Sequence, residues 1–237
     1  MRCTLTIAYN GTDFLGSQTQ KSSKNTVLGQ IEHVLKEINI DSKVIASGRT
    51  DRGVHATGQV CHIDLPPFWS DLQKLTKILN EMLPPSIHVK NIKAVDDSFH
   101  ARYSAKKRLY RYVIKEAQSN PFEDNFVTFL DSVDFETLKK NIKLFQGEFD
   151  FKNFMKSGSD IKSTLRVIYR TFAYRHKGFI ILSFEANGFL RSQIRLMVGA
   201  LLTLNADEII QQLTCKKKYK IKPAKSNGLY LAKIKYL

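Results

Sequence analysis

The residues best suited to chemistry lie close together between Gly48 and Gly53. Asp51 lies between these glycines, with Arg49 and Arg52 on either side of it. Neighbouring guanidinium groups favour the ionised form of a carboxylate, so this pattern predicts a nucleophile rather than a proton donor. The same residues also suit a solvated hairpin turn, because Asp and Gly favour turns. Spacing alone leaves both interpretations open.

The flanking sequence predicts how this stretch is held. The apolar run 44–46 precedes it and the alternating run 59–65 follows it. Such runs are typical of strands, so we expect a strand, a tight turn and a second strand. Gly48 and Gly53 bracket the turn, where the backbone either bends sharply or lets a ligand approach its amides.

The rest of the chain alternates between strand-like and helix-like patterns. The order β-α-β-β-α-β occurs roughly twice, which predicts an α+β fold of two halves with largely antiparallel sheets flanked by helices, residues 1–97 and 98–237. Arg191 and Arg195 are expected on one helical face, because residues four apart lie on neighbouring turns. We expect further strands over 5–9, 87–95, 107–115, 164–174, 179–185 and 229–236, and helices over 26–38, 70–82, 135–145, 189–204 and 207–213.

Charge is the strongest compositional signal. The chain of 237 residues has a formal net charge of +15, which indicates an anionic partner such as nucleic acid rather than a membrane surface. The stretch 106–112 mixes lysine and arginine with Tyr110 and Tyr112, a mixture suited to phosphate contact and base stacking. The stretch 215–220 is a compact basic loop. Either stretch is equally compatible with a solvated face.

Cysteine and histidine usage favours a reducing compartment without a metal site. Cys3, Cys61 and Cys215 lie far apart and lack metal-ligand spacing. The histidines are scattered too, and the residues alone favour a structural role for His55 and His62. The N-terminus lacks a signal pattern and the apolar run 197–204 is too short to span a bilayer. We therefore expect a soluble cytoplasmic protein.

Nine consecutive residues make the stretch around Asp51 far more specific than a lone glycine motif. Residues 48–56 resemble the signature of the TruA family of tRNA pseudouridine synthases, usually written G-R-T-D-x-G-V-H-A. The resemblance runs through the chain in the expected order. The other similar segments are 9–20, 99–102 running into 110–112, 187–190 with 194–195 and 198–199, and 223–224 with 228–231.

The resemblance implies a role for each matching residue. Asp51 matches the catalytic aspartate, Tyr110 the aromatic residue that stacks on the target base, and Arg195 the basic residue that pairs with the aspartate. Arg49 matches a residue thought to displace the base and hold the RNA. Substrate-binding positions are expected to include these four further residues: Arg52, His55, Lys107 and Arg111.

The resemblance also implies a reaction and its partners. The family isomerises uridine to pseudouridine at positions 38, 39 and 40 of the tRNA anticodon stem-loop, without a cofactor or metal. It works as a homodimer, and one tRNA touches both subunits. The implied architecture is the pseudouridine synthase fold with a central basic cleft. A synthase for other RNA positions and a non-catalytic basic RNA-binding protein remain alternatives.

The chemistry of the isomerisation agrees with these roles. The N-glycosidic bond must break, and the freed uracil must turn and rejoin the ribose through carbon. The base must leave the helix for a pocket, where aromatic stacking contributes ~1–3 kcal/mol per base. An ionised carboxylate held by a guanidinium then forms a covalent intermediate, with the attacked atom left open. A lone aspartate does not fit the two-carboxylate scheme of ordinary glycoside hydrolases.

The chain departs from the family pattern in three places. Ser17 stands where tryptophan is usual, so a packing or RNA-contact surface near the first loop is expected to differ. The run 191–193 replaces a segment with histidine and methionine, and the loop 225–227 is slightly longer. We expect these changes to affect substrate detail rather than the chemistry.

Overall fold

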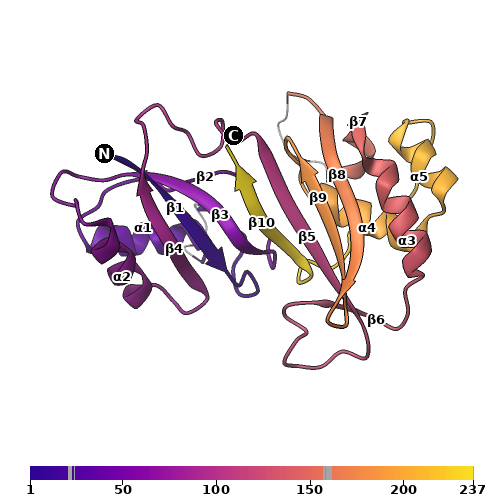
Figure 1. Ribbon diagram of the computed structural model, residues 1–237, viewed down its shortest axis with the longest axis horizontal. Coiled ribbons are helices and arrows are strands. Elements are labelled where there is room, and N and C mark those ends of the chain that lie inside the picture. The colour runs from indigo at the N-terminus through magenta and orange to yellow at the C-terminus, as the bar shows by residue number, and fades with distance from the viewer. Residues whose placement is uncertain (21–22, 24, 157, 159–161, 237) are drawn as a thin grey trace. The chain divides into compact units, whose positions relative to one another are not determined.

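The computed structural model describes residues 1–20, 23, 25–156, 158 and 162–236. Contacts divide it into two units. The first comprises Met1–Lys106 with Tyr230–Leu237, and the second comprises Lys107–Leu229. Each unit combines a largely antiparallel sheet with helices, as Figure 1 shows. The predicted α+β class is therefore confirmed.

The first unit is built on strands in the order β4-β1-β3-β10, with the short β2 added to β3. β1 is antiparallel to both β3 and β4, whereas β10 runs parallel to β3, with Tyr230 opposite His55. Two helices pack beside one another on this sheet (Figure 1). The elements are β1 (Arg2–Tyr9), α1 (Val27–Glu37), β2 (Ile45–Ala46), β3 (His55–Asp64), α2 (Leu72–Met82), β4 (Ile87–Ala94) and β10 (Leu229–Lys235).

The sequence explains where these elements begin. Buried and partly exposed residues alternate along β1, as a strand with one face on the core requires. Thr26 caps α1 because its hydroxyl accepts a hydrogen bond from the Gly29 amide at 3.2 Å. Asp71 caps α2 in the same way, accepting from the Lys74 amide at 2.8 Å. The expected strand and both expected helices are confirmed.

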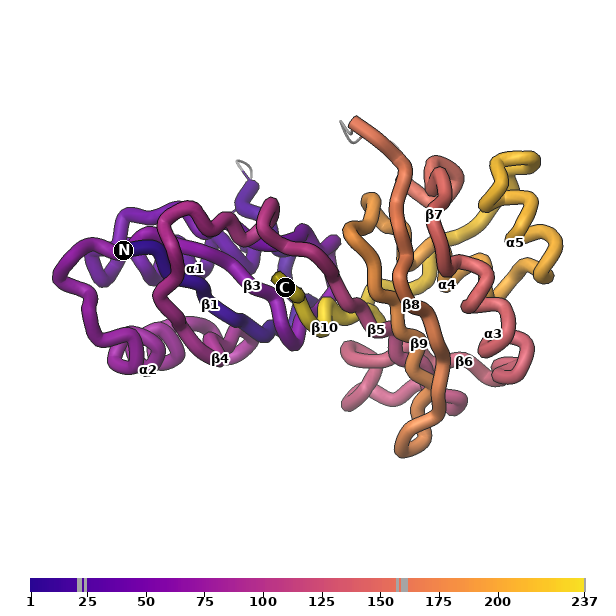
Figure 2. The backbone as a smooth tube through the Cα atoms, turned by 45° about the horizontal axis from the view of Figure 1, so that its top comes forward, coloured from indigo at the N-terminus to yellow at the C-terminus, as the bar shows by residue number. Residues whose placement is uncertain are grey.

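The second unit contains strands in the order β5-β9-β8-β7, with β6 parallel to β5. The helices α3, α4 and α5 lie together beside β8 and β9 in both views (Figures 1 and 2). The elements are β5 (Lys107–Glu116), β6 (Thr128–Leu130), α3 (Phe135–Asn141), the 3-10 helix η1 (Ile142–Phe145), β7 (Gly147–Asp150), the 3-10 helix η2 (Phe151–Phe154), β8 (Leu165–His176), β9 (Phe179–Ala186), α4 (Gln193–Thr203) and α5 (Ala206–Leu213).

Aromatic side chains form much of the second unit's core. Phe145, Phe151, Phe154 and Phe184 are fully buried, and Phe154 contacts the rings of the first two edge-on. Edge-on aromatic pairs add stabilisation beyond the apolar area that they bury. This core fixes η1 and η2 against the sheet that carries Tyr112.

One helix begins later than its apolar pattern predicts. We expected a helix over 189–204, but α4 begins at Gln193, and Ser192 adopts a left-handed φ of 59°. That conformation cannot continue a right-handed helix, so Arg191 lies before the helix. The prediction that Arg191 and Arg195 share a helical face is therefore wrong.

Other differences concern strand limits. β3 begins at His55 rather than at residue 59, because residues 55–56 find partners in β10 and β1. The predicted helix over 135–145 changes to a 3-10 helix at Ile142, and the short strands β6 and β7 were not expected. Contacts between residues divide the chain at 106/107. The domain boundary expected at 97/98 and the expected central basic cleft stay predictions.

Candidate active site

A tight turn presents Asp51 in the first unit. The Val54 amide donates to the Asp51 carbonyl at 3.1 Å, and Gly53 has a left-handed φ of 74° at the third position. A positive φ at this position is typical of a type II turn, which favours glycine there. Asp51 is half-buried, whereas Arg49 and Arg52 are exposed. The predicted turn is therefore present, and its sharp bend depends on Gly53.

Gln59 forms hydrogen bonds with the residues at the start of the Asp51 loop. Its side-chain amide donates to the Gly48 carbonyl at 2.7 Å and its oxygen accepts from the Ser47 hydroxyl at 2.6 Å. The Ser47 amide donates to the carbonyl of Val60 at 2.8 Å. Both Ser47 and Gln59 are buried, so these bonds are shielded from water. Sequence reasoning placed Gln59 in the following strand but gave it no such role.

Thr50, next to Asp51, is held from two sides. Its hydroxyl lies 2.8 Å from the hydroxyl of Tyr9. Its amide donates to the Ser17 hydroxyl at 2.9 Å, and the Ser17 amide donates to the Thr50 carbonyl at 3.1 Å. Ser17 is fully buried. The residue that departs from the family pattern therefore supports the Asp51 loop and lies inside the protein rather than on an RNA-contact surface.

His55 lies inside the first unit. Only 1% of its surface is exposed, and its Nδ1 accepts from the Gly11 amide at 3.0 Å. Its ring stacks on Tyr230, with centroids 4.7 Å apart. Burial raises the pKa of Tyr230 to about 12. This arrangement favours a structural role for His55 over direct contact with a substrate.

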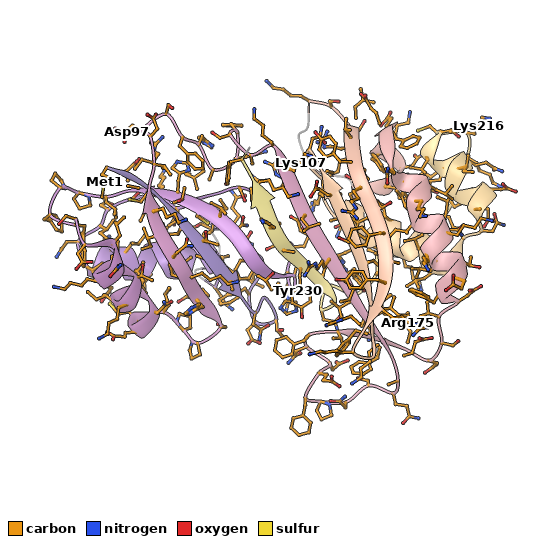
Figure 3. All side chains as sticks on the ribbon, in the orientation of Figure 1. Met1, Asp97, Lys107, Arg175, Lys216 and Tyr230 are labelled. Carbon is orange, nitrogen blue, oxygen red and sulfur yellow. The ribbon has the colours of Figure 1, made fainter. Side chains whose placement is uncertain are left out.

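Tyr110 and its neighbours lie on β5 of the second unit. Tyr110 is buried and its ring meets Phe189 edge-on at 5.3 Å. Arg111 is exposed, as the alternation of a strand predicts. Lys107, labelled in Figure 3 at the start of β5, lies 3.7 Å from a Glu185 oxygen and 4.7 Å from the centroid of the Tyr169 ring.

Arg195 lies in the first turn of α4 and is bound to a distant loop. Its Nε donates to the Ala224 carbonyl at 2.7 Å, and the Ala224 amide donates to the Arg195 carbonyl at 2.9 Å. Gly199, one turn further along α4, makes this approach possible. A Cβ on Gly199 would overlap the carbonyl oxygen of Lys222. The guanidinium is thus oriented by residues that follow the helix.

The loop that holds Arg195 is also bound by Tyr112, at Lys225, one residue further along the chain. The Tyr112 hydroxyl donates to the Lys225 carbonyl at 2.9 Å and lies 2.7 Å from the Thr128 hydroxyl. Burial raises the pKa of Tyr112 to about 12. Gly228 fits tightly here, since a Cβ would lie 2.7 Å from the Thr128 hydroxyl. Sequence reasoning gave none of these contacts.

Comparison with known proteins identifies the family. A family model described as tRNA pseudouridine synthase matches residues 5–104 and 142–237. The chain belongs to the tRNA pseudouridine synthase family. Members are isomerases, and the matched ranges contain Asp51 and Arg195. Tyr110 lies between the two matched ranges.

Several relatives of this family are similar over nearly their whole length. The chain is 38% identical to tRNA pseudouridine synthase A of Campylobacter jejuni strain RM1221, with 100% of both chains covered. It is 39% identical to the Wolinella succinogenes protein of that name, covering 97% of this chain and 92% of that one. The Helicobacter hepaticus protein is 38% identical, with 97% of each chain covered.

Structural similarity adds little to these sequence matches. A solved Cbf5-Nop10-Gar1 complex gives a TM-score of 0.39 at 13% identity, covering 84% of this chain and 45% of that one. The family assignment therefore rests on the sequence matches. No helix among the described residues is long and apolar enough to cross a bilayer. Among those same residues, no group of three or more His, Cys, Asp or Glu side chains could hold a metal ion.

The predicted site residues of this synthase divide between the two units. Arg49, Asp51, Arg52 and His55 belong to the first unit, and Lys107, Tyr110, Arg111 and Arg195 belong to the second. Within the second unit, Arg195 and Tyr112 are linked through the loop 224–225. A cavity shared by Asp51, Tyr110 and Arg195 stays a prediction.

Proposed function

We propose that this chain converts uridine to pseudouridine at positions 38, 39 and 40 of the tRNA anticodon stem-loop. The observation that carries the proposal is the type II turn, which presents Asp51 at the position where the family signature has its aspartate. The relatives named tRNA pseudouridine synthase A support tRNA as the substrate.

In this mechanism Asp51 is the nucleophile. The target nucleotide leaves the helix, because the bond to be broken is inaccessible within the stack. Tyr110 stacks on the uracil, and the Asp51 carboxylate forms the covalent intermediate that splits a difficult rearrangement into two easier steps. Arg195 pairs with Asp51 and orients it through a charge-assisted hydrogen bond. The bonds from Arg195 to Ala224 support this role by fixing the direction of the guanidinium.

The remaining predicted residues bind RNA or position the loop. Arg49, Arg52 and Arg111 are exposed cations suited to phosphate contact, and Lys107 is partly exposed. We assign His55 to positioning, because it is buried and bound to the Gly11 amide. It acts on the substrate through the Asp51 loop.

We further propose that the protein is a cytoplasmic homodimer that uses neither a cofactor nor a metal ion. The family resemblance supports each of these points. Sedimentation of the purified protein, with and without tRNA, tests the dimer. A single monomeric species at micromolar concentration would contradict it.

Tritium release tests the isomerisation directly. The substrate is unmodified tRNA carrying tritium at uracil C5, since that carbon loses its hydrogen when it becomes the glycosidic carbon. We expect wild-type protein to release tritium and Asp51→Asn to release none while still binding tRNA. Asp13→Asn, which removes an exposed loop carboxylate of the same unit, is the matched control. Normal turnover by Asp51→Asn would exclude Asp51 as the nucleophile.

The position of the product separates the alternatives. Transcripts that carry a single uridine at position 38, 39 or 40 should each yield pseudouridine. Product only in other RNAs would favour a related synthase of different specificity. Tight binding without product in any RNA would favour a non-catalytic RNA-binding protein.

A further inference from the structure

A lysine-rich stretch follows α5 in the second unit. Residues 216–225, here called the lysine segment, contain six lysines and no acidic residue. Glu208 is the last acidic residue of the whole chain. Lys216, labelled in Figure 3, lies three residues beyond the end of α5. All six lysines are exposed, and they are Lys216, Lys217, Lys218, Lys220, Lys222 and Lys225.

Hydrogen bonds fix the main chain at the start of the lysine segment. The amides of Lys216 and Lys217 both donate to the Gln211 carbonyl, at 2.9 and 3.3 Å. The Tyr219 amide donates to the side-chain oxygen of Gln212 at 2.7 Å, and the Tyr219 hydroxyl donates to the side-chain oxygen of Gln211 at 2.8 Å. A segment that is already ordered loses less conformational freedom when it binds a partner.

The far end of the lysine segment is fixed against α4. A Cβ on Gly199 would overlap the carbonyl oxygen of Lys222, so the two main chains are in direct contact there. Two residues later, Ala224 exchanges two hydrogen bonds with Arg195. The segment therefore extends from the end of α5 to the arginine that we propose pairs with the catalytic carboxylate.

The positive charges of the lysine segment are not neutralised by the protein. In the part of the chain that the structure describes, no ion pair includes a lysine of this segment. Lys217 lies over the Tyr219 ring, with its Nζ 4.8 Å from the centroid, and this contact leaves its charge in place. Like charges held close together repel one another, and an anion bound among them removes that repulsion.

The extent of the lysine segment indicates which anion binds. The fixed main chain spreads six charges over ten residues, whereas a small anion would contact only two or three of them. A nucleic acid suits such a segment, because its backbone carries a negative phosphate at every nucleotide. The continuity of the segment with Arg195 favours the RNA substrate over a membrane surface.

We propose that the lysine segment binds phosphate groups of the tRNA backbone. Lysine contacts a phosphate as a point charge, so these contacts position the RNA without reading its sequence. This inference rests on the proposed function in taking the anion to be tRNA. The fixed main chain and the lack of carboxylate partners distinguish the segment from a merely solvated basic loop.

The salt dependence of tRNA binding tests the segment. The test variant combines Lys216→Gln with Lys218→Gln in the full-length protein, which leaves Lys217 over the Tyr219 ring and keeps every main-chain bond described above. The affinity for tRNA is measured between about 50 and 200 mM salt. We expect weaker binding and a log–log slope that falls by ~0.7–1.8, which corresponds to one or two lost phosphate contacts. An unchanged slope would overturn the site.

The matched control removes two exposed lysines that have carboxylate partners. It combines Lys77→Gln with Lys139→Gln, since Lys77 lies 3.9 Å from Glu81 and Lys139 lies 4.0 Å from Glu136. The net charge changes by the same amount, and we expect the slope of the wild type. An equal fall in this control would show that net charge alone is responsible and would overturn the site.

An arginine pair separates charge from packing. Lys216→Arg with Lys218→Arg retains both charges, so its slope should match that of the wild type. A fall in the slope of this pair would mean that the lysines act through the fold rather than through their charge, which would overturn the site.

Two further measurements separate this site from its alternatives. Vesicles of phosphatidylserine and phosphatidylcholine test a membrane surface. Retention of the wild type on them that the glutamine pair loses, with an unchanged slope for tRNA, would overturn the proposal. Binding is measured without turnover, so the result is independent of the reaction. A slope that falls as expected in a protein that releases no tritium would keep the phosphate contacts and remove the isomerase assignment, whereas an unchanged slope with normal tritium release would do the reverse.

Discussion

Arg195 and Ala224 are joined by two hydrogen bonds of opposite direction. The arginine Nε donates to the Ala224 carbonyl at 2.7 Å, and the Ala224 amide donates to the Arg195 carbonyl at 2.9 Å. Tyr112 holds the next residue, Lys225, through its carbonyl. The proposed partner of the catalytic carboxylate is therefore oriented by a loop 29 residues further along the chain.

Gly199→Ala should reduce turnover more than tRNA affinity. The new Cβ would overlap the Lys222 carbonyl and push the loop away from α4, which loosens the Arg195–Ala224 bonds. Overpacking of this kind costs ~1–3 kcal/mol of stability. Single-turnover rates and tRNA affinity measured on the same protein separate the two effects. Ile168→Val, a milder core change in β8, provides a control that lowers stability without touching this loop. An equal loss of turnover in that control would contradict positioning by Gly199.

Gly53→Ala should slow turnover because the Asp51 turn needs a left-handed residue. An L-residue at a φ of 74° costs ~1–2 kcal/mol, and asparagine adopts this conformation more easily than alanine. We therefore expect activity to fall in the order glycine, asparagine, alanine. Tritium release by the three proteins measures this order. Full activity of the alanine variant would show that the turn does not depend on Gly53.

Ser17→Ala should destabilise the catalytic loop. The change leaves the buried Thr50 amide without its hydroxyl acceptor, and such a loss costs ~1–3 kcal/mol. Chemical denaturation should show the lower stability, and turnover should fall because Thr50 adjoins Asp51. Thr19→Ala removes an exposed hydroxyl bond to Glu32 and should have little effect on either. If both variants behave alike, Ser17 has no special role in the loop.

His62 should make the protein less stable in mild acid. Burial lowers its pKa below the ordinary 6.5, with further lowering by Arg2 and His100, so the unfolded chain binds the proton first. Stability from this group is complete above pH 6.5 and is lost as the pH falls toward the folded pKa. Replacing His62 with glutamine should make the free energy of unfolding depend less on pH over this window. The same change at the exposed His88 is the control, and an identical effect there would refute the role of His62.

Local patterns predicted most elements because each depends on nearby residues. The alternation in β1 and the glycine of the Asp51 turn are both readable within a few positions. The start of α4 was not readable, because the left-handed conformation of Ser192 interrupts an unbroken apolar pattern. Local patterns did not reveal β6, because it is only three residues long.

The supports of the site could not be predicted for a different reason. Ser17 meets Thr50 across 33 residues, and Arg195 meets Ala224 across 29. Neither the residue type nor the spacing of Ser17 or Ala224 predicts such a distant partner. Residue types alone indicate which side chains could react, whereas the contacts that orient those side chains arise only when the chain folds.

β10 has a consequence for how the protein is made. This strand pairs with β3 of the first unit. Ala232 lies so close to Gly58 that a Cβ on Gly58 would overlap the Ala232 carbonyl oxygen. Ribosomes synthesise β10 after the whole second unit. The first unit's sheet therefore lacks this strand throughout translation of residues 107–229, and His55 cannot stack on Tyr230 until β10 has been made.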